Sequence, residues 1–203
     1  MNAQNCSTSS LAVLPVSNSP LTINLAEPKI LTLEECGYAL MEIPLEDLTF
    51  ADFKGIFQRL KLDAERLKKQ IHWQPHRYSY QVIWQNPRFE FLNCGWTPKQ
   101  SSTVHDHTGA YAGIFVLEGQ ITSRLFEIVP DYYGQKLVET SQEELTAGMF
   151  TFVDKNEIHQ LSNNSVENAI TFHVYSRPLQ TLNIYWPNAN KSEKIAIRYH
   201  ISR

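Results

Sequence analysis

Residues 101–113 read Ser101-Ser102-Thr103-Val104-His105-Asp106-His107-Thr108-Gly109-Ala110-Tyr111-Ala112-Gly113, and an apolar run follows them as far as Gly119. We interpret the His105-x-His107 pair as lying on a β-strand. Side chains two apart on a strand point to the same face, with α-carbons about 6.5 Å apart. Two imidazoles at that spacing can bind one metal ion. A third ligand has to come from elsewhere, and His159 is placed to supply it. The working hypothesis is a metal held by His105, His107 and His159.

The chain after residue 75 predicts short β-strands with no helices between them. Turn-forming residues such as Gln85-Asn86-Pro87 and Asn163-Asn164 separate the apolar segments. The expected strands are 78–84, 89–96, 112–117, 121–128, 149–153, 157–161, 169–175, 181–185 and 194–200. Many short strands at regular spacing are typical of an antiparallel sandwich or barrel. The fold class is therefore expected to be mainly β.

Two short helices are expected before the strands, where they would cover one end or side of a sheet. Thr49 with Asp52 three residues later resembles a capping box, although Asp replaces the usual Glu or Gln. An apolar stripe at helical spacing follows, formed by Phe50, Phe53, Phe57 and Leu60. Asp63 can cap a second helix that reaches Gln70. For residues 31–41 a helix and an extended segment both remain open.

Length and composition predict one folded domain behind a tail. The chain has 203 residues, of which 42% are hydrophobic, enough for a sizeable core. Residues 1–28 are rich in Ser, Asn and Pro without periodicity, so we expect a disordered tail there. Residues 29–203 are expected to form the domain, with N-terminal helices and a barrel at about 75–203.

The net charge and the cysteine content limit the classes of partner and the cellular compartment expected for this chain. A formal charge of −3 argues against nucleic acid or an anionic membrane as the main partner. No apolar run approaches the roughly 20 residues of a membrane span, and Leu11–Leu14 has no basic flank and ends at Pro15, unlike a signal peptide. The cysteines Cys6, Cys36 and Cys94 form neither a disulfide framework nor a zinc-finger spacing. We therefore expect a cytoplasmic protein, and we expect Cys94 to be a small buried hydrophobe.

Two groups of residues resemble the motifs of the cupin family. The first group is His105-x-His107, Ala112 and Gly119, and the second is Gly148, Asp154, His159 and Asn163. The usual first motif has a glutamate where this chain has Ala112, so the carboxylate ligand is missing. That departure is characteristic of the thiol dioxygenases, above all the cysteine dioxygenase family, whose iron is held by three histidines.

Three further stretches between residues 75 and 185 are similar to that family. They are Arg77-Tyr78-Ser79, then Cys94-Gly95-Trp96 leading into residues 101–108, and Thr171-Phe172-His173-Val174-Tyr175-Ser176-Arg177-Pro178, which resembles Ser-x-His-x-Tyr-Ser-x-Pro. The resemblance implies a cupin double-stranded β-helix barrel with a short helical N-terminal lead. It implies a non-haem iron(II) enzyme that adds both atoms of O2 to the sulfur of a small thiol, cysteine or a related compound, giving a sulfinic acid. A monomer or weak homo-oligomer is expected.

The chemistry of the three histidines agrees with that expectation and leaves alternatives. Neutral imidazoles leave a divalent ion its full charge and open positions, where a bound thiol ionises because its pKa falls. Iron(II) suits imidazole ligands and O2 chemistry, whereas zinc also accepts three histidines with water. A cupin that uses zinc, manganese or nickel for hydrolysis, isomerisation or another oxygenation therefore stays open. So does a binding or sensor cupin without turnover.

Further side chains are expected near the metal. Thr171, His173 and Tyr175 share one strand face because they are two apart. In the family this trio is hydrogen-bonded, with the phenol near substrate and oxygen; the alternative is that Tyr175 is an ordinary core aromatic. Asp106 should point to the opposite face from its neighbouring histidines. Glu157 could share the face of the third histidine and stays open as a fourth ligand.

The chain departs from the family pattern at two positions. Some family members cross-link the tyrosine to a cysteine, and Ala112 stands at that position, so no thioether can form. The carboxylate-binding arginine of the family corresponds to Tyr80, which removes a charge-assisted hydrogen bond of about 1.5–3 kcal/mol. Substrate contacts are expected from Tyr78, Tyr80 and Arg77, with Arg77 or Arg88 reaching in only if the loop differs in register. The hypothesis is a thiol other than free cysteine, either without a carboxylate or with a larger group.

Overall fold

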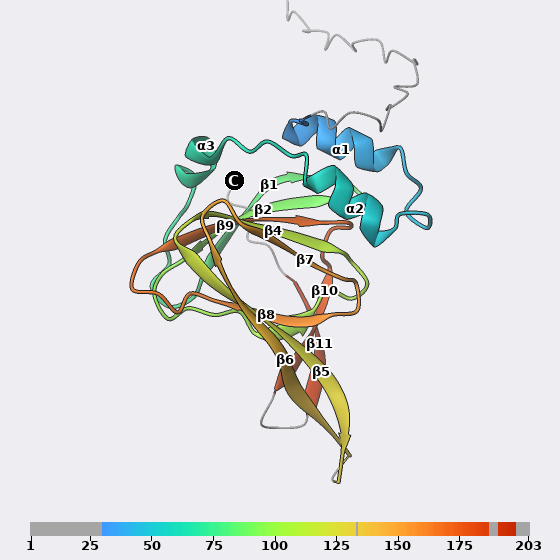
Figure 1. Ribbon diagram of the computed structural model, residues 1–203, viewed down its shortest axis with the longest axis vertical. Coiled ribbons are helices and arrows are strands. Elements are labelled where there is room, and N and C mark those ends of the chain that lie inside the picture. The colour runs from blue at the N-terminus through green and yellow to red at the C-terminus, as the bar shows by residue number, and fades with distance from the viewer. Residues whose placement is uncertain (1–29, 133, 187–190, 198–203) are drawn as a thin grey trace, which may run out of the picture.

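Two antiparallel sheets face each other in the computed structural model, which describes residues 30–132, 134–186 and 191–197 (Figure 1). The five-stranded sheet has the order β1-β2-β9-β4-β7, and the six-stranded sheet has the order β11-β10-β3-β8-β5-β6. The strands are β1 Ser79–Gln85, β2 Glu90–Trp96, β3 Val104–Asp106, β4 Ala112–Glu118, β5 Gln120–Asp131, β6 Gly134–Thr146, β7 Phe150–Val153, β8 Ile158–Ser162, β9 Ala169–Tyr175, β10 Thr181–Trp186 and β11 Lys191–Ala196. This is the cupin double-stranded β-helix that the sequence predicts.

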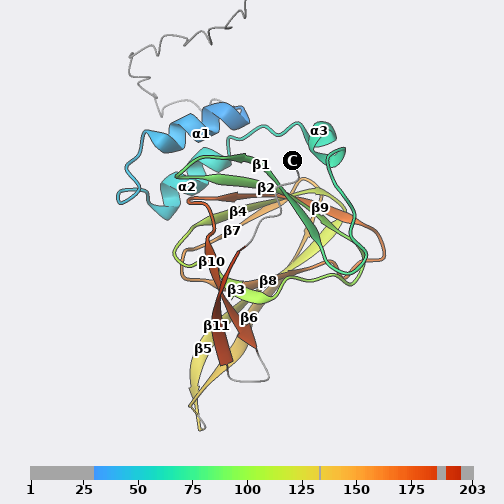
Figure 2. The same cartoon turned by 180° about the vertical axis from the view of Figure 1, so that it is seen from behind.

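Three short helices precede the strands, and α1 and α2 lie over the outer face of the five-stranded sheet (Figures 1 and 2). They are α1 Leu33–Met41, α2 Phe50–Phe57 and α3 Ala64–Lys68. The Thr49–Asp52 capping box at the start of α2 is confirmed, and so is the cap of α3, where Asp63 accepts a hydrogen bond from Arg66 N. The segment that the sequence left undecided is helical, because Thr32 caps α1 through a second capping box.

Strand β9 contributes side chains to both hydrophobic core clusters. All seven of its residues are buried, since β2 and β4 flank it and both of its faces are covered. Phe172 and Val174 pack outward in the cluster that the helices complete. Thr171, His173 and Tyr175 alternate with them and therefore point into the barrel. The helices thus cover the outer face of the sheet whose inner face carries Thr171, His173 and Tyr175.

The sequence missed one long strand. Among the described strands, β6 pairs only with β5, and together they form a hairpin that projects from the barrel (Figure 1). Nearly all of β6 is exposed or half-buried, so its side chains show no apolar alternation. The hairpin is joined by its backbone ladder and by polar side-chain pairs such as Gln120–Glu144 and Arg124–Gln142, and a periodicity argument cannot detect such a strand.

The ends of the chain show smaller differences. Strand β11 begins at Lys191, earlier than the expected residue 194, and its expected C-terminal part at 198–200 lies outside the described residues. The expected disordered tail, 1–28, lies outside them as well. Among the residues that the structure describes, no helix is both long and apolar enough to cross a bilayer.

The two cysteines in the described part of the chain, Cys36 and Cys94, are free and buried. Burial raises the pKa of Cys36 to about 12 and also raises that of Cys94. Cys94 packs in the inner core cluster, as expected of a small hydrophobe.

Candidate metal centre

The three histidines singled out by the sequence meet inside the barrel. His105 on β3 is the ladder partner of His159 on β8, and His107 follows β3 directly. One ring nitrogen from each lies within 4.8 Å of the others, and the Nε2 atoms of His107 and His159 are 3.0 Å apart. All three side chains are buried. Strand pairing, which sequence spacing does not report, is what brings the third histidine to the first two.

The arrangement fits a metal ion with three imidazole ligands. Two ring nitrogens bound to one ion at about 2.0–2.1 Å each lie about 3 Å apart when they occupy neighbouring octahedral positions. The 3.0 Å separation of His107 and His159 matches that value. His105 Nδ1 donates to the Thr103 carbonyl oxygen at 2.9 Å, which fixes the ring hydrogen and leaves Nε2 as a lone-pair donor.

The protonation state of the histidines also suits metal binding. Burial holds the pKa of His105 below its usual value and those of His107 and His159 well below it, and the neighbouring histidines lower the last two further. A histidine must be neutral to act as a ligand. At neutral pH these rings are therefore ready to bind a cation without first losing a proton.

Carboxylates of the described residues take no part in the cluster. Within that part of the chain, the group that could hold a metal consists of the three histidines alone. Ala112, at the position of the usual cupin glutamate, is buried in the inner core. Glu157, which the sequence left open as a fourth ligand, accepts a hydrogen bond from Asp154 N at 2.6 Å in the turn before β8. The site therefore offers an ion three neutral donors.

Asp106 points away from the cluster, as strand alternation predicts, and ties β3 to β10. Its carboxylate accepts hydrogen bonds from Thr108 N at 2.8 Å, Asn183 Nδ2 at 2.9 Å and Tyr185 Oη at 2.7 Å. These contacts hold the backbone between the two histidines in place. Sequence reasoning missed Asn183 and Tyr185, since no spacing rule links them to a residue so distant in the chain.

A line of hydrogen bonds crosses the inner face of β9. Trp96 Nε1 donates to Thr171 Oγ1 at 2.8 Å, and that oxygen is 2.7 Å from His173 Nε2. His173 Nδ1 is 3.1 Å from the Tyr175 hydroxyl, and the Tyr175 ring centroid is 5.1 Å from that of His107. The trio expected from the sequence is thus hydrogen-bonded beside the cluster. The sequence pattern does not predict the hydrogen bond from Trp96, because it joins residues 75 positions apart.

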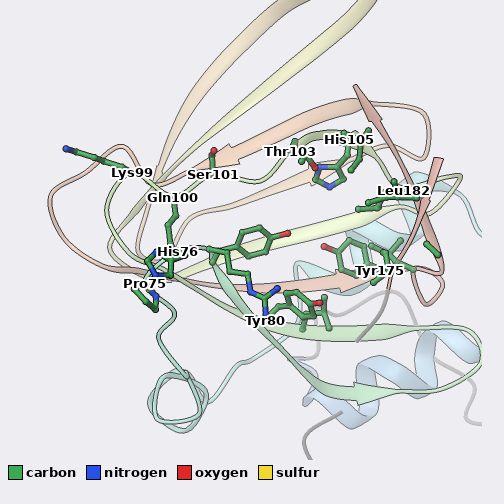
Figure 3. Close-up of a pocket in the computed structure, with 18 of the residues that line it drawn as sticks. Pro75, His76, Tyr80, Lys99, Gln100, Ser101, Thr103, His105, Tyr175 and Leu182 are labelled. Atoms are coloured by element: carbon green, nitrogen blue, oxygen red, sulfur yellow. The ribbon is translucent and has the colours of Figure 1, made fainter. Parts of the chain in front are cut away.

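A cavity of about 790 Å³ opens onto this centre. Figure 3 shows His105 and Tyr175 at one end of it and Pro75 and His76 at the other. His105 belongs to the six-stranded sheet and Tyr175 to the five-stranded sheet, so both walls of the barrel reach the cavity. A small molecule that enters it therefore contacts His105 of the cluster and the Tyr175 phenol.

The three expected substrate contacts, Arg77, Tyr78 and Tyr80, all line this cavity. Tyr78 stacks on Trp96 with ring centroids 4.3 Å apart, and burial raises its pKa, so it is a neutral phenol. Arg88 lies elsewhere: its guanidinium donates to the carbonyl oxygens of Leu40, Met41 and Ile43 beside the end of α1. Of the two arginines considered for the site, only Arg77 lies at the cavity.

Known proteins of one family are similar to this chain. A family model described as cysteine dioxygenase type I matches residues 47–187. Cysteine dioxygenase type 1 of Homo sapiens is 22% identical over 158 residues, covering 76% of this chain and 78% of that protein. The Rattus norvegicus protein of the same name is 25% identical over 128 residues, covering 62% and 64% respectively.

Solved structures are also similar to the chain. An uncharacterized protein of Klebsiella pneumoniae with a double-stranded β-helix domain has a TM-score of 0.43 at 14% identity, covering 65% of this chain and 95% of that one. The family model spans α2, α3, the three histidines and Tyr175, whereas the part of the cavity wall formed by residues 195–197 lies beyond it. On the match to the family model, the chain belongs to the cysteine dioxygenase type I family.

Proposed function

We propose that the protein is a non-haem iron(II) thiol dioxygenase that converts a thiol R–SH and O2 into a sulfinic acid R–SO2H. Both oxygen atoms then end on sulfur, and no other reductant is consumed. One observation carries the proposal: three buried, neutral imidazoles lie together beside the Tyr175 phenol, and His105 and Tyr175 line one cavity. Relatives named cysteine dioxygenase type 1 support the reaction class.

His105, His107 and His159 are the proposed ligands. Iron(II) bound by them supplies redox chemistry and open coordination positions for thiol and O2. The three rings are buried, with His107 and His159 each 1% exposed, so contact with bulk water is limited. A low-dielectric pocket strengthens each polar contact made inside it.

Tyr175 is proposed to place or receive a proton near the reacting sulfur. Burial lowers the pKa of His173 to about 3, so its ring is neutral and only one ring nitrogen carries hydrogen. Trp96 can only donate to Thr171. With the Thr171 hydroxyl donating to His173 Nε2, Nδ1–H donates to the Tyr175 oxygen, and the phenol hydrogen is directed to an acceptor outside this line. Positioned acids and bases of this kind contribute about 10²–10⁴-fold to a rate.

Replacing Tyr175 by phenylalanine is expected to lower kcat about 10²-fold or to uncouple O2 uptake from sulfinate formation, with iron still bound. The ring and its packing remain, so only the hydroxyl is tested. Iron content, O2 consumption and sulfinate yield are measured on the same samples. Tyr132→Phe is the matched control, because Tyr132 is 90% exposed at the tip of the β5–β6 hairpin. Unchanged turnover and coupling in Tyr175→Phe would show that Tyr175 is an ordinary core aromatic with no part in the reaction.

The reaction itself is tested by O2 consumption of the iron(II)-loaded protein with cysteine, 3-mercaptopropionate, cysteamine and larger thiols. We expect uptake with at least one thiol, one sulfinate formed per O2, and weak activity with free cysteine because Tyr80 replaces the carboxylate-binding arginine. Zinc-loaded protein should consume no O2, since zinc has no redox chemistry. If no thiol stimulates uptake, the proposal is wrong, and a non-catalytic cupin or another metal reaction takes its place.

We further propose a cytoplasmic location. Both cysteines in the described part of the chain are free, which suits a reducing compartment where thiol substrates also persist.

A further inference from the structure

The cavity at the metal centre is larger than a cysteine-sized substrate needs. Its volume of about 790 Å³ lies in the upper part of the roughly 300–1,000 Å³ range typical of pockets for drug-sized ligands. A water molecule takes about 30 Å³ of liquid, so the cavity corresponds to about 26 waters. Figure 3 shows that it extends from His105 and Tyr175 toward Pro75 and His76. A substrate that fills it must therefore extend well beyond its sulfur.

The walls of the cavity favour an apolar chain. Its lining includes aliphatic side chains from β2, β10 and β11, from the loop before β10 and from the residue after β11: Leu92, Leu179, Leu182, Ile184, Ile195 and Ile197. The rings of Tyr78 and Tyr80 add aromatic surface. Each methylene buried against such a surface contributes roughly a factor of four in affinity. The middle of the ligand is thus expected to be hydrocarbon.

The charged residues of the cavity are all cationic. Arg77 and Lys99 line it, and no Asp or Glu is among its described lining residues. Neither cation forms an ion pair within the described part of the chain. Lys99 extends away from the other lining residues (Figure 3). Arg77, two residues before β1, is an exposed residue of the cavity wall and is therefore the cation best placed to receive an anion there. A guanidinium binds a carboxylate through two parallel hydrogen bonds.

We propose that the substrate is an elongated mercapto-carboxylate, with its thiol at the three histidines, its hydrocarbon chain along the apolar walls and its carboxylate on Arg77. This proposal rests on the proposed function. Tyr80 stands where the family binds a carboxylate close to the sulfur. Arg77 follows His76, which lies at the end of the cavity opposite His105 (Figure 3), so Arg77 would bind a carboxylate farther from the sulfur. The position of the carboxylate-binding cation would then set the specificity. A cation farther along the cavity favours a longer substrate.

The test compares ω-mercaptoalkanoates of increasing length on the iron-loaded protein. Relative to 3-mercaptopropionate, 6-mercaptohexanoate should have about 50-fold higher kcat/KM, because three more methylenes are buried. Arg77→Gln should lower kcat/KM for 6-mercaptohexanoate about 10- to 100-fold and leave neutral 6-mercaptohexanol within about twofold. Arg66→Gln removes the same charge from an exposed residue of α3 outside the cavity and should change neither thiol.

A second readout does not depend on turnover. Heptanoate, in which a methyl group replaces the thiol, and 1-heptanol are titrated into the full chain by calorimetry. Wild type should prefer heptanoate by about 10- to 100-fold, and Arg77→Gln should lose that preference. Equal binding of acid and alcohol by wild type, or an unchanged preference in Arg77→Gln, would overturn the assignment of Arg77. Carboxylate binding at Arg77 without oxidation of any thiol would instead contradict the dioxygenase reaction alone.

Discussion

Replacing His159 by alanine is expected to abolish iron binding and thiol-dependent O2 uptake together. His159 is one of only three candidate ligands in the described residues, and no carboxylate among them stands close enough to replace it. Loss of a residue that merely supports a ligand costs 10–100-fold in metal affinity, so loss of a ligand should cost more. We expect less than about one tenth of the wild-type iron content after dialysis, and activity reduced by more than about 10²-fold.

Thermal unfolding with and without iron separates metal loss from misfolding. Iron at about 100 times its dissociation constant should stabilise wild type by about 2.7 kcal/mol, which raises Tm by about 5–11 °C for a chain of this size. His159→Ala should keep a cooperative transition in the absence of metal and show no shift on adding iron. Its strand β8 is held between β3 and β5 by backbone ladders that the substitution leaves intact.

His72→Ala provides the control, because His72 is exposed and lies outside the cluster and the cavity. It should retain full iron content and the full Tm shift. Full retention of metal by His159→Ala would show that the third ligand has been misassigned.

Replacing Gly119 by alanine is expected to cause a large loss of stability. Gly119 joins β4 to β5 with φ +74°, and a Cβ there would lie 2.4 Å from the Asn168 carbonyl oxygen and 2.9 Å from the Ala169 Cα. Left-handed backbone costs an L-residue about 1–2 kcal/mol, and overpacking against fixed atoms adds about 1–3 kcal/mol. The expected total of about 2–5 kcal/mol lowers Tm by about 4–20 °C.

Gly148→Ala isolates the backbone contribution. Gly148 also has a positive φ, +90°, yet nothing lies within 4 Å of the position that an added methyl group would take. It should therefore lose only about 1–2 kcal/mol. Gly55→Ala in helix α2 meets open space as well and should gain about 0.5–1 kcal/mol, because glycine is a poor helix former. The free energies of unfolding of the three variants, measured by chemical denaturation, check this order. Equal losses in Gly119→Ala and Gly148→Ala would show that the backbone at the start of β9 shifts to accommodate the added methyl group.

Most of the fold was predicted from local sequence patterns. The capping box at Thr49 and the cap at Asp63 involve residues three apart, so they can be read directly from the sequence and the structure has both. Strands with a buried face, such as β9, show their length through apolar runs. Strand β6 has no buried face, and nothing in its composition marks it. Where burial imposes no pattern, the pairing partner alone defines the strand.

The sequence by itself predicted the type of site: a His-x-His pair, the absence of a carboxylate at Ala112, and the face shared by His173 and Tyr175. The pair and the shared face depend on the two-residue repeat of a strand, which is local geometry, although His107 lies just past the end of β3. The missing carboxylate came from the resemblance to the cupin motif. Tertiary structure decided which groups meet. The pairing of β3 with β8 brings His159 to the pair, and the path of the chain before β1 brings Arg77, and not Arg88, to the cavity. Contacts between segments far apart in the chain depend on sheet register and core packing, and these arise only when the whole barrel closes.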